Sequence, residues 1–380
     1  MIVNDLRVPF VDFSFQHQPI QAQLEAAIKA VVERGDFVLG QAVTEFEQAF
    51  ATASSSNYGI GVASGTDAIA LGLQACGIGK GDEVILPANT FIATAIGVLA
   101  AGATPILVDC DLETALIDLD AAAKAITPRT KAIIPVHLYG QMVSPSKLLA
   151  LALEYNLLIF EDAAQAHLAE REGYRAGSIG IAAAFSLYPS KNLGAFGDGG
   201  ILITKDEAIA KKARALRNYG AYHKYIHAEL GRNSRLDTLQ AAVLNIKLPH
   251  LEGWNQARNQ AAQVYDRELQ QLKSWGITPL KNNCGDGHIY HLYVIRIEKS
   301  CPLTREIIQD KLNYYGIQTG IHYPIPCHLQ PAYGHLGYQT GDFPGAEKLA
   351  QEILSLPMYP GLSKLQVQHV VASLKNLFVR

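Results

Sequence analysis

Short apolar runs alternate with alanine-rich segments between residues 58 and 203, and this alternation limits the fold more than any other feature of the chain. Apolar runs indicate strands and alanine-rich segments indicate helices, an order typical of βαβ units in a mostly parallel sheet. Strands that are apolar on both faces need helices on both sides of the sheet. The sequence therefore predicts an α/β fold with a large seven-stranded sheet. We expect strands at 58–62, 83–86, 104–108, 132–136, 157–160, 183–186 and 200–203, and helices at 66–76, 90–101, 119–126 and 144–155.

The chain after residue 206 is mainly helical and predicts a second, smaller unit. A total of 380 residues suits two domains. The segment 251–275 has the composition of a connecting helix, so we expect a large domain over 1–250, followed by a linking helix and a small C-terminal α+β domain over 251–380. The other expected elements are helices at 206–218, 236–248, 304–315, 346–354 and 364–374, and a strand at 290–297.

Charge and cysteine content exclude several partners and locations. The net charge is −3, from 32 basic and 35 acidic residues, and no Lys/Arg run is long enough to follow a nucleic-acid backbone. The five cysteines form neither a C-x-x-C pair nor a disulfide framework, which fits a reducing cytosol. Residues 1–5 show no export signal, and no apolar stretch is long enough to span a bilayer. We expect a cytoplasmic protein with no nucleic-acid, membrane or metal partner.

The first candidate ligand site follows the first strand, because open α/β sheets bind ligands at the carboxyl ends of their strands. Residues 63–68 form a small-residue turn leading into a helix, whose free N–H groups would hold a phosphate. A plain N-cap at Thr66 explains the same residues. The spacing of Gly59, Gly61 and Gly65 departs by one residue from the dinucleotide fingerprint, which argues against a nicotinamide enzyme.

The fifth and sixth strands are followed by a carboxylate and a lysine. Asp162 shares a strand face with Phe160, so it points inward and needs a partner such as a protonated heteroaromatic nitrogen; an acidic helix N-cap is the alternative. Lys191 lies among aromatic and apolar residues, where burial would lower its pKa and suit it to Schiff-base chemistry; a solvated surface lysine is the alternative. The pair Asp198-Gly199 predicts a hairpin turn.

The order of these features points to one cofactor. A phosphate-holding turn, the aromatic Phe91 after the second strand, the inward Asp162 and then Lys191 form an arrangement that could grip pyridoxal phosphate (PLP). Several longer motifs accompany it. They are Val8-Pro-Phe-Val-Asp, Gly61-Val-Ala-Ser-Gly-Thr-Asp-Ala, Pro135-Val-His-Leu-Tyr-Gly-Gln, Glu161-Asp-Ala-Ala-Gln-Ala-His, Tyr188-Pro-Ser-Lys-Asn-Leu-Gly and Asn233-Ser-Arg-Leu-Asp.

With these motifs, nearly the whole chain resembles the DegT/DnrJ/EryC1/StrS sugar aminotransferases, PLP enzymes of the aspartate-aminotransferase-like fold (fold type I). The resemblance implies that Lys191 forms a Schiff base with PLP and moves the proton, and that Asp162 pairs with the pyridinium nitrogen. It further implies that Gln165 bonds the ring hydroxyl, that Phe91 stacks on the ring, that Gly65, Thr66 and Ser186 hold the phosphate, and that Asn233 reaches it from the partner subunit of a homodimer with composite sites.

The implied reaction transfers an amino group from a donor, usually glutamate, to a keto group on a nucleotide-linked sugar. Segments 218–225 and 320–333 resemble the 3-aminotransferase branch, so we expect a dTDP-linked 3-keto-6-deoxyhexose; a 4-keto sugar nucleotide is the alternative. The residues expected near the sugar nucleotide are Tyr188, His322, Tyr323 and His328.

Two positions depart from the family pattern, and three other functions compete with the aminotransferase. Leu168 stands where the family usually has glycine, and Ile181 where it often has aspartate; neither is a cofactor position. A relative that removes a sugar hydroxyl carries histidine in place of the lysine, which Lys191 argues against. A non-enzymatic regulator would leave Lys191 and Asp162 unexplained, and a nicotinamide-dependent oxidoreductase has the wrong glycine spacing.

Overall fold

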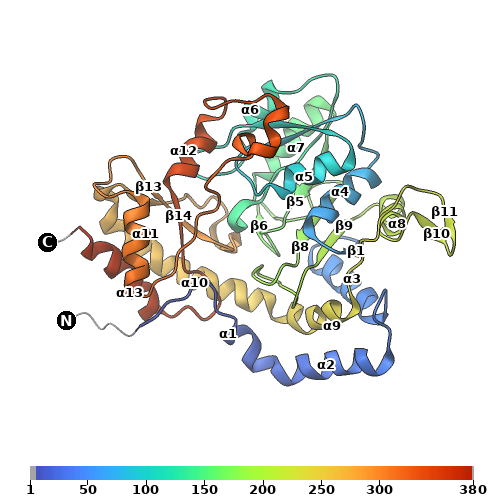
Figure 1. Cartoon of the computed structure of the whole chain (residues 1–380), viewed down its shortest axis with the longest axis horizontal. Coiled ribbons are helices and arrows are strands. Elements are labelled where there is room, and N and C mark those ends of the chain that lie inside the picture. Colours follow the sequence, from blue (N-terminus) through green and yellow to red (C-terminus); the bar gives the residue numbers. More distant parts are fainter. Residues whose placement is uncertain (1–5, 379–380) are drawn as a thin grey trace.

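The computed structural model describes residues 6–378, in which a large sheet with helices on both faces lies beside a smaller sheet near the C-terminus (Figure 1). The expectation that no export signal is present concerns residues 1–5, which lie outside the described residues. Between residues 6 and 378 no helix has both the length and the apolar character needed to cross a membrane. All five cysteines are described, and none forms a disulfide.

The large sheet contains all seven strands expected from the sequence, in the order β1-β9-β8-β5-β4-β2-β3. Only β9 runs antiparallel to its neighbours, so the predicted α/β fold with a mostly parallel sheet is confirmed. The strands are β1 (Tyr58–Val62), β2 (Glu83–Pro87), β3 (Thr104–Val108), β4 (Thr130–Ile133), β5 (Leu158–Asp162), β8 (Ala182–Ser186) and β9 (Gly200–Thr204).

Helices cover both faces of this sheet because its strands bury alternate residues in two different cores. In β8, Ala182 and Ala184 belong to one hydrophobic core, whereas Ala183 and Phe185 belong to the other. Figure 1 shows α2 running alongside α9, below the sheet. The helices before residue 250 are α1 (Ser14–His17), α2 (Gln21–Arg34), α3 (Gln41–Ala53), α4 (Gly65–Ala75), α5 (Ala93–Ala101), α6 (Leu119–Lys124), α7 (Pro145–Tyr155), α8 (Glu207–Leu216) and α9 (Thr238–Lys247).

Three details of this region differ from the sequence prediction. Helices α1 to α3 precede the first strand and were not predicted. The fourth strand was expected to reach Val136, but its ladder ends at Ile133, and Val136 pairs with Asp162 through a single bridge. Pro135 lacks the N–H needed to continue a regular ladder. The pair Asp198-Gly199 is not a hairpin turn, because it ends a loop over residues 187–199 that joins β8 to β9.

The second unit is built on a three-stranded antiparallel sheet with its own hydrophobic core. The segment 346–354 was predicted to be a helix, but the helix α12 ends at Glu352 and the chain continues as β14, which pairs with β13. The elements are β12 (Ile277–Pro279), β13 (Tyr293–Ile297), β14 (Ile353–Leu356), α10 (Leu251–Leu269), α11 (Arg305–Tyr314), α12 (Pro344–Glu352) and α13 (Lys364–Asn376). We propose that the domain boundary falls at the start of α10, near residue 250.

The remaining elements are short. Two small hairpins, β6–β7 and β10–β11, lie outside the two larger sheets, and several 3₁₀ turns join the longer elements. These elements are β6 (Glu170–Arg171), β7 (Tyr174–Arg175), β10 (Ala221–His223), β11 (Ile226–His227), and the 3₁₀ helices η1 (Gln18–Ile20), η2 (Leu138–Gly140), η3 (Leu248–His250), η4 (Gln270–Trp275), η5 (Gly285–Gly287), η6 (Cys327–Leu329) and η7 (Pro331–Leu336).

Candidate active site

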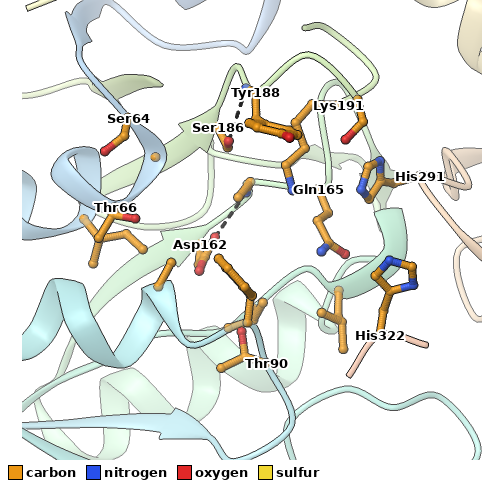
Figure 2. A pocket seen from close by; sticks show the side chains of 18 of the residues that line it. Ser64, Thr66, Thr90, Asp162, Gln165, Ser186, Tyr188, Lys191, His291 and His322 are labelled. Atoms are coloured by element: carbon orange, nitrogen blue, oxygen red, sulfur yellow. Dashed lines mark hydrogen bonds between the residues drawn. The ribbon is translucent and has the colours of Figure 1, made fainter. Parts of the chain in front are cut away.

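A cavity of about 400 Å³ lies at the carboxyl ends of β5 and β8. Figure 2 shows Ser64 and Thr66 at one end of it and His291 and His322 at the other, with Asp162 and Lys191 between them. Most of the residues predicted from the sequence line this cavity. They are Gly65, Thr66, Phe91, Asp162, Gln165, Ser186, Tyr188, Lys191, His322 and Tyr323.

One end of the cavity is the N-terminus of α4. The Ser64 hydroxyl caps this helix by accepting the Asp67 N–H at 3.1 Å, whereas no acceptor among the described residues bonds the N–H groups of Gly65 and Thr66. A Cβ added to Gly65 would lie 2.8 Å from the Cβ of Ser186, so only glycine lets the helix start this close to β8. Free N–H groups at a helix N-terminus favour an anion such as a phosphate.

Asp162 supplies a buried carboxylate in the middle of the cavity. It is 5% exposed, and its two oxygens accept the Thr94 hydroxyl at 2.7 Å and the Ala164 N–H at 3.1 Å. Burial raises the pKa of Asp162, while these two hydrogen bonds and the nearby Lys191 act in the opposite direction. A carboxylate has about four lone-pair directions, so Asp162 keeps capacity for a further donor from the cavity.

Lys191 follows β8 in the loop over residues 187–199, where its backbone N–H bonds the Tyr188 carbonyl at 2.9 Å. Burial lowers the pKa of Lys191 to about 8, although the charge of Asp162 acts in the opposite direction. An unperturbed lysine titrates near pH 10.4, so Lys191 has a far larger neutral fraction at physiological pH. A neutral amine is what nucleophilic attack on an aldehyde requires.

Gln165, Tyr323 and Phe91 form part of the cavity wall. The Gln165 carbonyl oxygen accepts the Tyr139 N–H at 2.7 Å, and its amide donates to the Tyr323 hydroxyl at 3.1 Å. The ring of Phe91, which is half-exposed, lies 5.3 Å from that of Tyr323. These side chains offer a polar edge and an aromatic face to a planar ligand.

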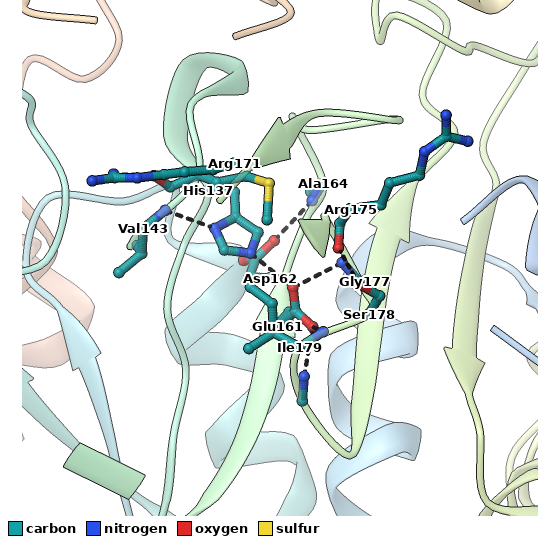
Figure 3. A network of polar contacts seen from close by, with 12 residues as sticks. His137, Val143, Glu161, Asp162, Ala164, Arg171, Arg175, Gly177, Ser178 and Ile179 are labelled. Atoms are coloured by element: carbon teal, nitrogen blue, oxygen red, sulfur yellow. Dashed lines mark hydrogen bonds and ion pairs between the residues drawn. The ribbon is translucent and has the colours of Figure 1, made fainter. Parts of the chain in front are cut away.

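Glu161 precedes Asp162 on β5 but does not line the cavity; Figure 3 shows the polar network around it. It is fully buried, and the protein supplies every hydrogen bond that its carboxylate can accept. Its oxygens take the N–H groups of Gly177, Ile179 and Gly180, each at 2.8 Å, and lie 2.9 Å from Nε2 of His137. Glu161 therefore anchors the segment after the β6–β7 hairpin.

Two predicted site residues do not line the cavity. His328 is 2% exposed, its Nε2 lies 3.0 Å from Glu347, and its ring packs against Phe343. The predicted sugar contact of His328 therefore has no support from its position. Asn233 is exposed and outside the cavity, in a bridge with Asn218, so a cofactor contact within its own subunit is absent from the described structure.

Several site residues were missed by the sequence analysis. Ser64, Thr90 and His291 line the cavity, and Thr94 bonds Asp162. Ser64 could have been recognised as an N-cap from its place before the helix. Thr94 and His291 carry no local signal, because only the packing of α5 and of the segment before β13 brings them to the site.

The donor set fits PLP. The α4 N-terminus with Ser186 provides an anion site, Asp162 provides a carboxylate for a protonated ring nitrogen, and Lys191 provides an amine of lowered pKa. The fold and the site together define a PLP-dependent enzyme of fold type I.

The sequence profile of the DegT/DnrJ/EryC1/StrS aminotransferase family matches residues 18–375. The chain belongs to this family, which confirms the resemblance, the aminotransferase class and the PLP cofactor. Leu168, where the family usually has glycine, has a φ of 63°, a left-handed conformation that favours glycine.

Two curated relatives and one solved structure illustrate the similarity. A "Pleiotropic regulatory protein" of Geobacillus stearothermophilus is 43% identical over 98% of this chain and 99% of its own length. The dTDP-3-amino-3,4,6-trideoxy-alpha-D-glucose transaminase of Streptomyces venezuelae is 43% identical over 97% and 96%. The crystal structure of S. venezuelae DesV in complex with a ketimine intermediate has a TM-score of 0.92 and 42% identity over 98% of this chain and 99% of that one.

Proposed function

We propose that this aminotransferase acts on a nucleotide-linked 3-keto sugar, with glutamate as the amino donor. The observation that carries the proposal is one cavity that combines Lys191, Asp162 and the free α4 N-terminus, in a chain 43% identical to a transaminase named for a dTDP-3-amino sugar. The resemblance of segments 218–225 and 320–333 to the 3-aminotransferase branch favours dTDP and a 6-deoxyhexose.

Residues of the cavity have proposed roles in holding PLP or in moving the proton. Bound PLP supplies an electron sink for the pair released when the proton leaves the amino carbon. Asp162 would keep the ring nitrogen protonated through its carboxylate, the α4 N-terminus and Ser186 would hold the phosphate, and Gln165 and Phe91 would fix the ring. As a neutral amine, Lys191 would carry the proton, and its lowered pKa suits that task.

The sugar nucleotide would enter beside Tyr188, His322 and Tyr323. Tyr188 is half-exposed at the cavity, and His322 is fixed by Ser355, which lies 2.9 Å from its Nδ1. The Phe10 ring stacks on His322 at 5.6 Å. Fixed side chains at the rim support one orientation of the sugar, which selection of a single keto carbon requires.

A substrate panel tests this proposal. The enzyme, loaded with PLP and supplied with glutamate, is offered 3-keto and 4-keto sugar nucleotides, each linked to dTDP or UDP. We expect strong preference for a dTDP-linked 3-keto sugar. Preference for a 4-keto sugar would overturn the proposed position of amination, and preference for a UDP-linked sugar would overturn the proposed nucleotide.

We also propose a cytoplasmic homodimer in which Asn233 completes the partner's phosphate site. The exposed position of Asn233, outside its own cavity, supports this assignment. Mixing Lys191→Ala and Asn233→Ala chains should produce heterodimers with one doubly altered site and one intact site, so activity should return. Absence of any recovery, after subunit exchange has been demonstrated, would contradict a shared site.

A regulatory role is the second candidate, since one relative is named as a pleiotropic regulatory protein. A protein acting only as a regulator would not need Lys191, Asp162 and a phosphate site together. Purified protein that takes up PLP and converts a keto sugar nucleotide excludes a purely regulatory function, and a protein that binds PLP without turnover on the whole panel favours it.

A further inference from the structure

Asn192, directly after Lys191, is buried and uses all its polar atoms. Its Nδ2 donates to Oδ1 of Asn255 at 2.8 Å and to the Ile289 carbonyl at 3.1 Å. Its Oδ1 lies 3.1 Å from Nδ1 of His291. An amide oxygen only accepts, so the hydrogen of this bond belongs to Nδ1 of His291.

This bond fixes the tautomer of His291. With its hydrogen on Nδ1, a neutral imidazole has an unprotonated Nε2 that acts as an acceptor. Burial lowers the pKa of His291 well below its usual value, and the positive charges of Lys191 and Arg258 act in the same direction, as do His322 and His167. His291 therefore stays neutral at physiological pH.

The free nitrogen of His291 is open to the cavity. The residue is 8% exposed and lines the cavity on the side where Figure 2 shows Lys191, Gln165 and His322. No donor among the described residues bonds Nε2, and the atom is not sealed inside the protein. A nearly buried residue at a cavity wall whose acceptor has no protein donor is completed by a donor on a ligand.

Resting on the proposed function, we infer that Nε2 of His291 accepts a hydrogen bond from a ring hydroxyl next to the carbon that is aminated. The amino donor and the sugar occupy the cavity in turn. The α-amino group of glutamate is the group that reacts at the cofactor, and its carboxylates have no hydrogen to donate at neutral pH, whereas the hydroxyls of the sugar do. His291 therefore contributes to binding the sugar and not to binding glutamate.

The two half-reactions, followed separately by the absorbance of the cofactor, test this inference. His291→Phe keeps a ring of similar size and removes the acceptor. We expect kcat/KM of the sugar half-reaction to fall roughly 10- to 100-fold, because a substrate hydroxyl loses its buried partner, while the glutamate half-reaction changes less than about twofold. His288→Phe is the matched control, because His288 is buried in the same segment and lies outside the cavity.

Calorimetric binding provides a second readout. The amino-sugar product and two analogues, each lacking one hydroxyl beside the aminated carbon, are titrated into the wild type and into His291→Phe. The wild type should bind one analogue at least about fivefold more weakly than the product, and His291→Phe should lose that difference.

Equal binding of all three ligands by the wild type, a difference that persists in His291→Phe, or an equal loss in the glutamate half-reaction would overturn the inference. Failure of the proposed function is distinguishable, because the wild type itself would then convert no 3-keto sugar nucleotide.

Discussion

Glu161 and Asp162 are consecutive buried carboxylates at the end of β5, and they differ in how many hydrogen bonds the protein donates to them. Glu161 faces the β6–β7 side, where three backbone N–H groups and His137 surround it. Asp162 faces the cavity, and within residues 6–378 its carboxylate has Thr94 and Ala164 as its only donors. Since buried charge without full hydrogen bonding is costly, the incomplete shell of Asp162 marks the carboxylate that is kept for a ligand.

Replacing Asp162 gives the largest predicted effect on catalysis. In Asp162→Asn the amide cannot keep the ring nitrogen of PLP protonated, so we expect both half-reactions to slow at least about a hundredfold. The melting temperature should change little, because the amide oxygen can still accept the Ala164 N–H while the amide NH₂ donates to the Thr94 hydroxyl, which can accept as well as donate. Stopped-flow rates and thermal unfolding measure the two quantities. A rate within about tenfold of wild type would contradict the assigned role.

Replacing Glu161 should produce the opposite result. The Glu161→Gln amide turns an NH₂ group toward backbone N–H donors, so we expect a loss of roughly 3 kcal/mol in the free energy of unfolding. Exposed Glu170→Gln, on the adjacent hairpin, is the control and should cost less than about 0.5 kcal/mol. Denaturant unfolding measures both. An unchanged Glu161→Gln would show that its hydrogen bonds add no net stability.

The titration of Lys191 sharpens the comparison. In the cofactor-free enzyme, labelling of this amine should show a midpoint near pH 8. The negative charge of Asp162 stabilises the ammonium form, so Asp162→Asn should lower the midpoint and Glu161→Gln should leave it unchanged.

The same pKa predicts the pH dependence of stability. Unfolded Lys191 binds its proton more tightly than folded Lys191, so its burial penalty is complete below about pH 8 and disappears as the pH rises from about 8 toward 10.5. A labelling midpoint near the normal lysine value, unchanged in Asp162→Asn, would contradict both the burial of Lys191 and its proximity to Asp162.

Thr94→Val gives the smallest predicted effect. It removes the 2.7 Å hydrogen bond to Asp162, which raises the pKa of that carboxyl further and should slow turnover about tenfold or less. Thr94→Ser keeps the hydroxyl and should restore the wild-type rate. Equal rates in Thr94→Val and wild type would show that the Ala164 N–H alone orients Asp162.

The sequence predicted the large sheet well because its strands are apolar on both faces and lie between helices. It failed at β14, where residues 353–356 follow α12 without a break and become a strand only by pairing with β13. Pairing partners far apart in the chain leave no local signal.

The same holds for the site: residues placed by a neighbouring strand were predicted, and residues placed by contacts distant in the sequence were not. Asp162 and Lys191 were predicted from their places just after strands, and both line the cavity. His328 belongs to a recognisable motif, but its partner Glu347 lies in α12, and the sequence does not reveal that this contact draws its side chain away from the cavity. His291 was not predicted as a site residue. Its Nε2 is left as a free acceptor because its Nδ1 bonds Asn192, and the sequence does not reveal this contact.

Borohydride reduction of the PLP-loaded enzyme, followed by peptide mapping, tests the central claim most directly. A second buried lysine, Lys247, provides an internal control, because burial also lowers its pKa to about 8 but it lies outside the cavity. We predict that the cofactor becomes attached to Nζ of Lys191 and that Lys247 remains unmodified. Attachment to Lys247 or another lysine, or no attachment at all, would contradict the account.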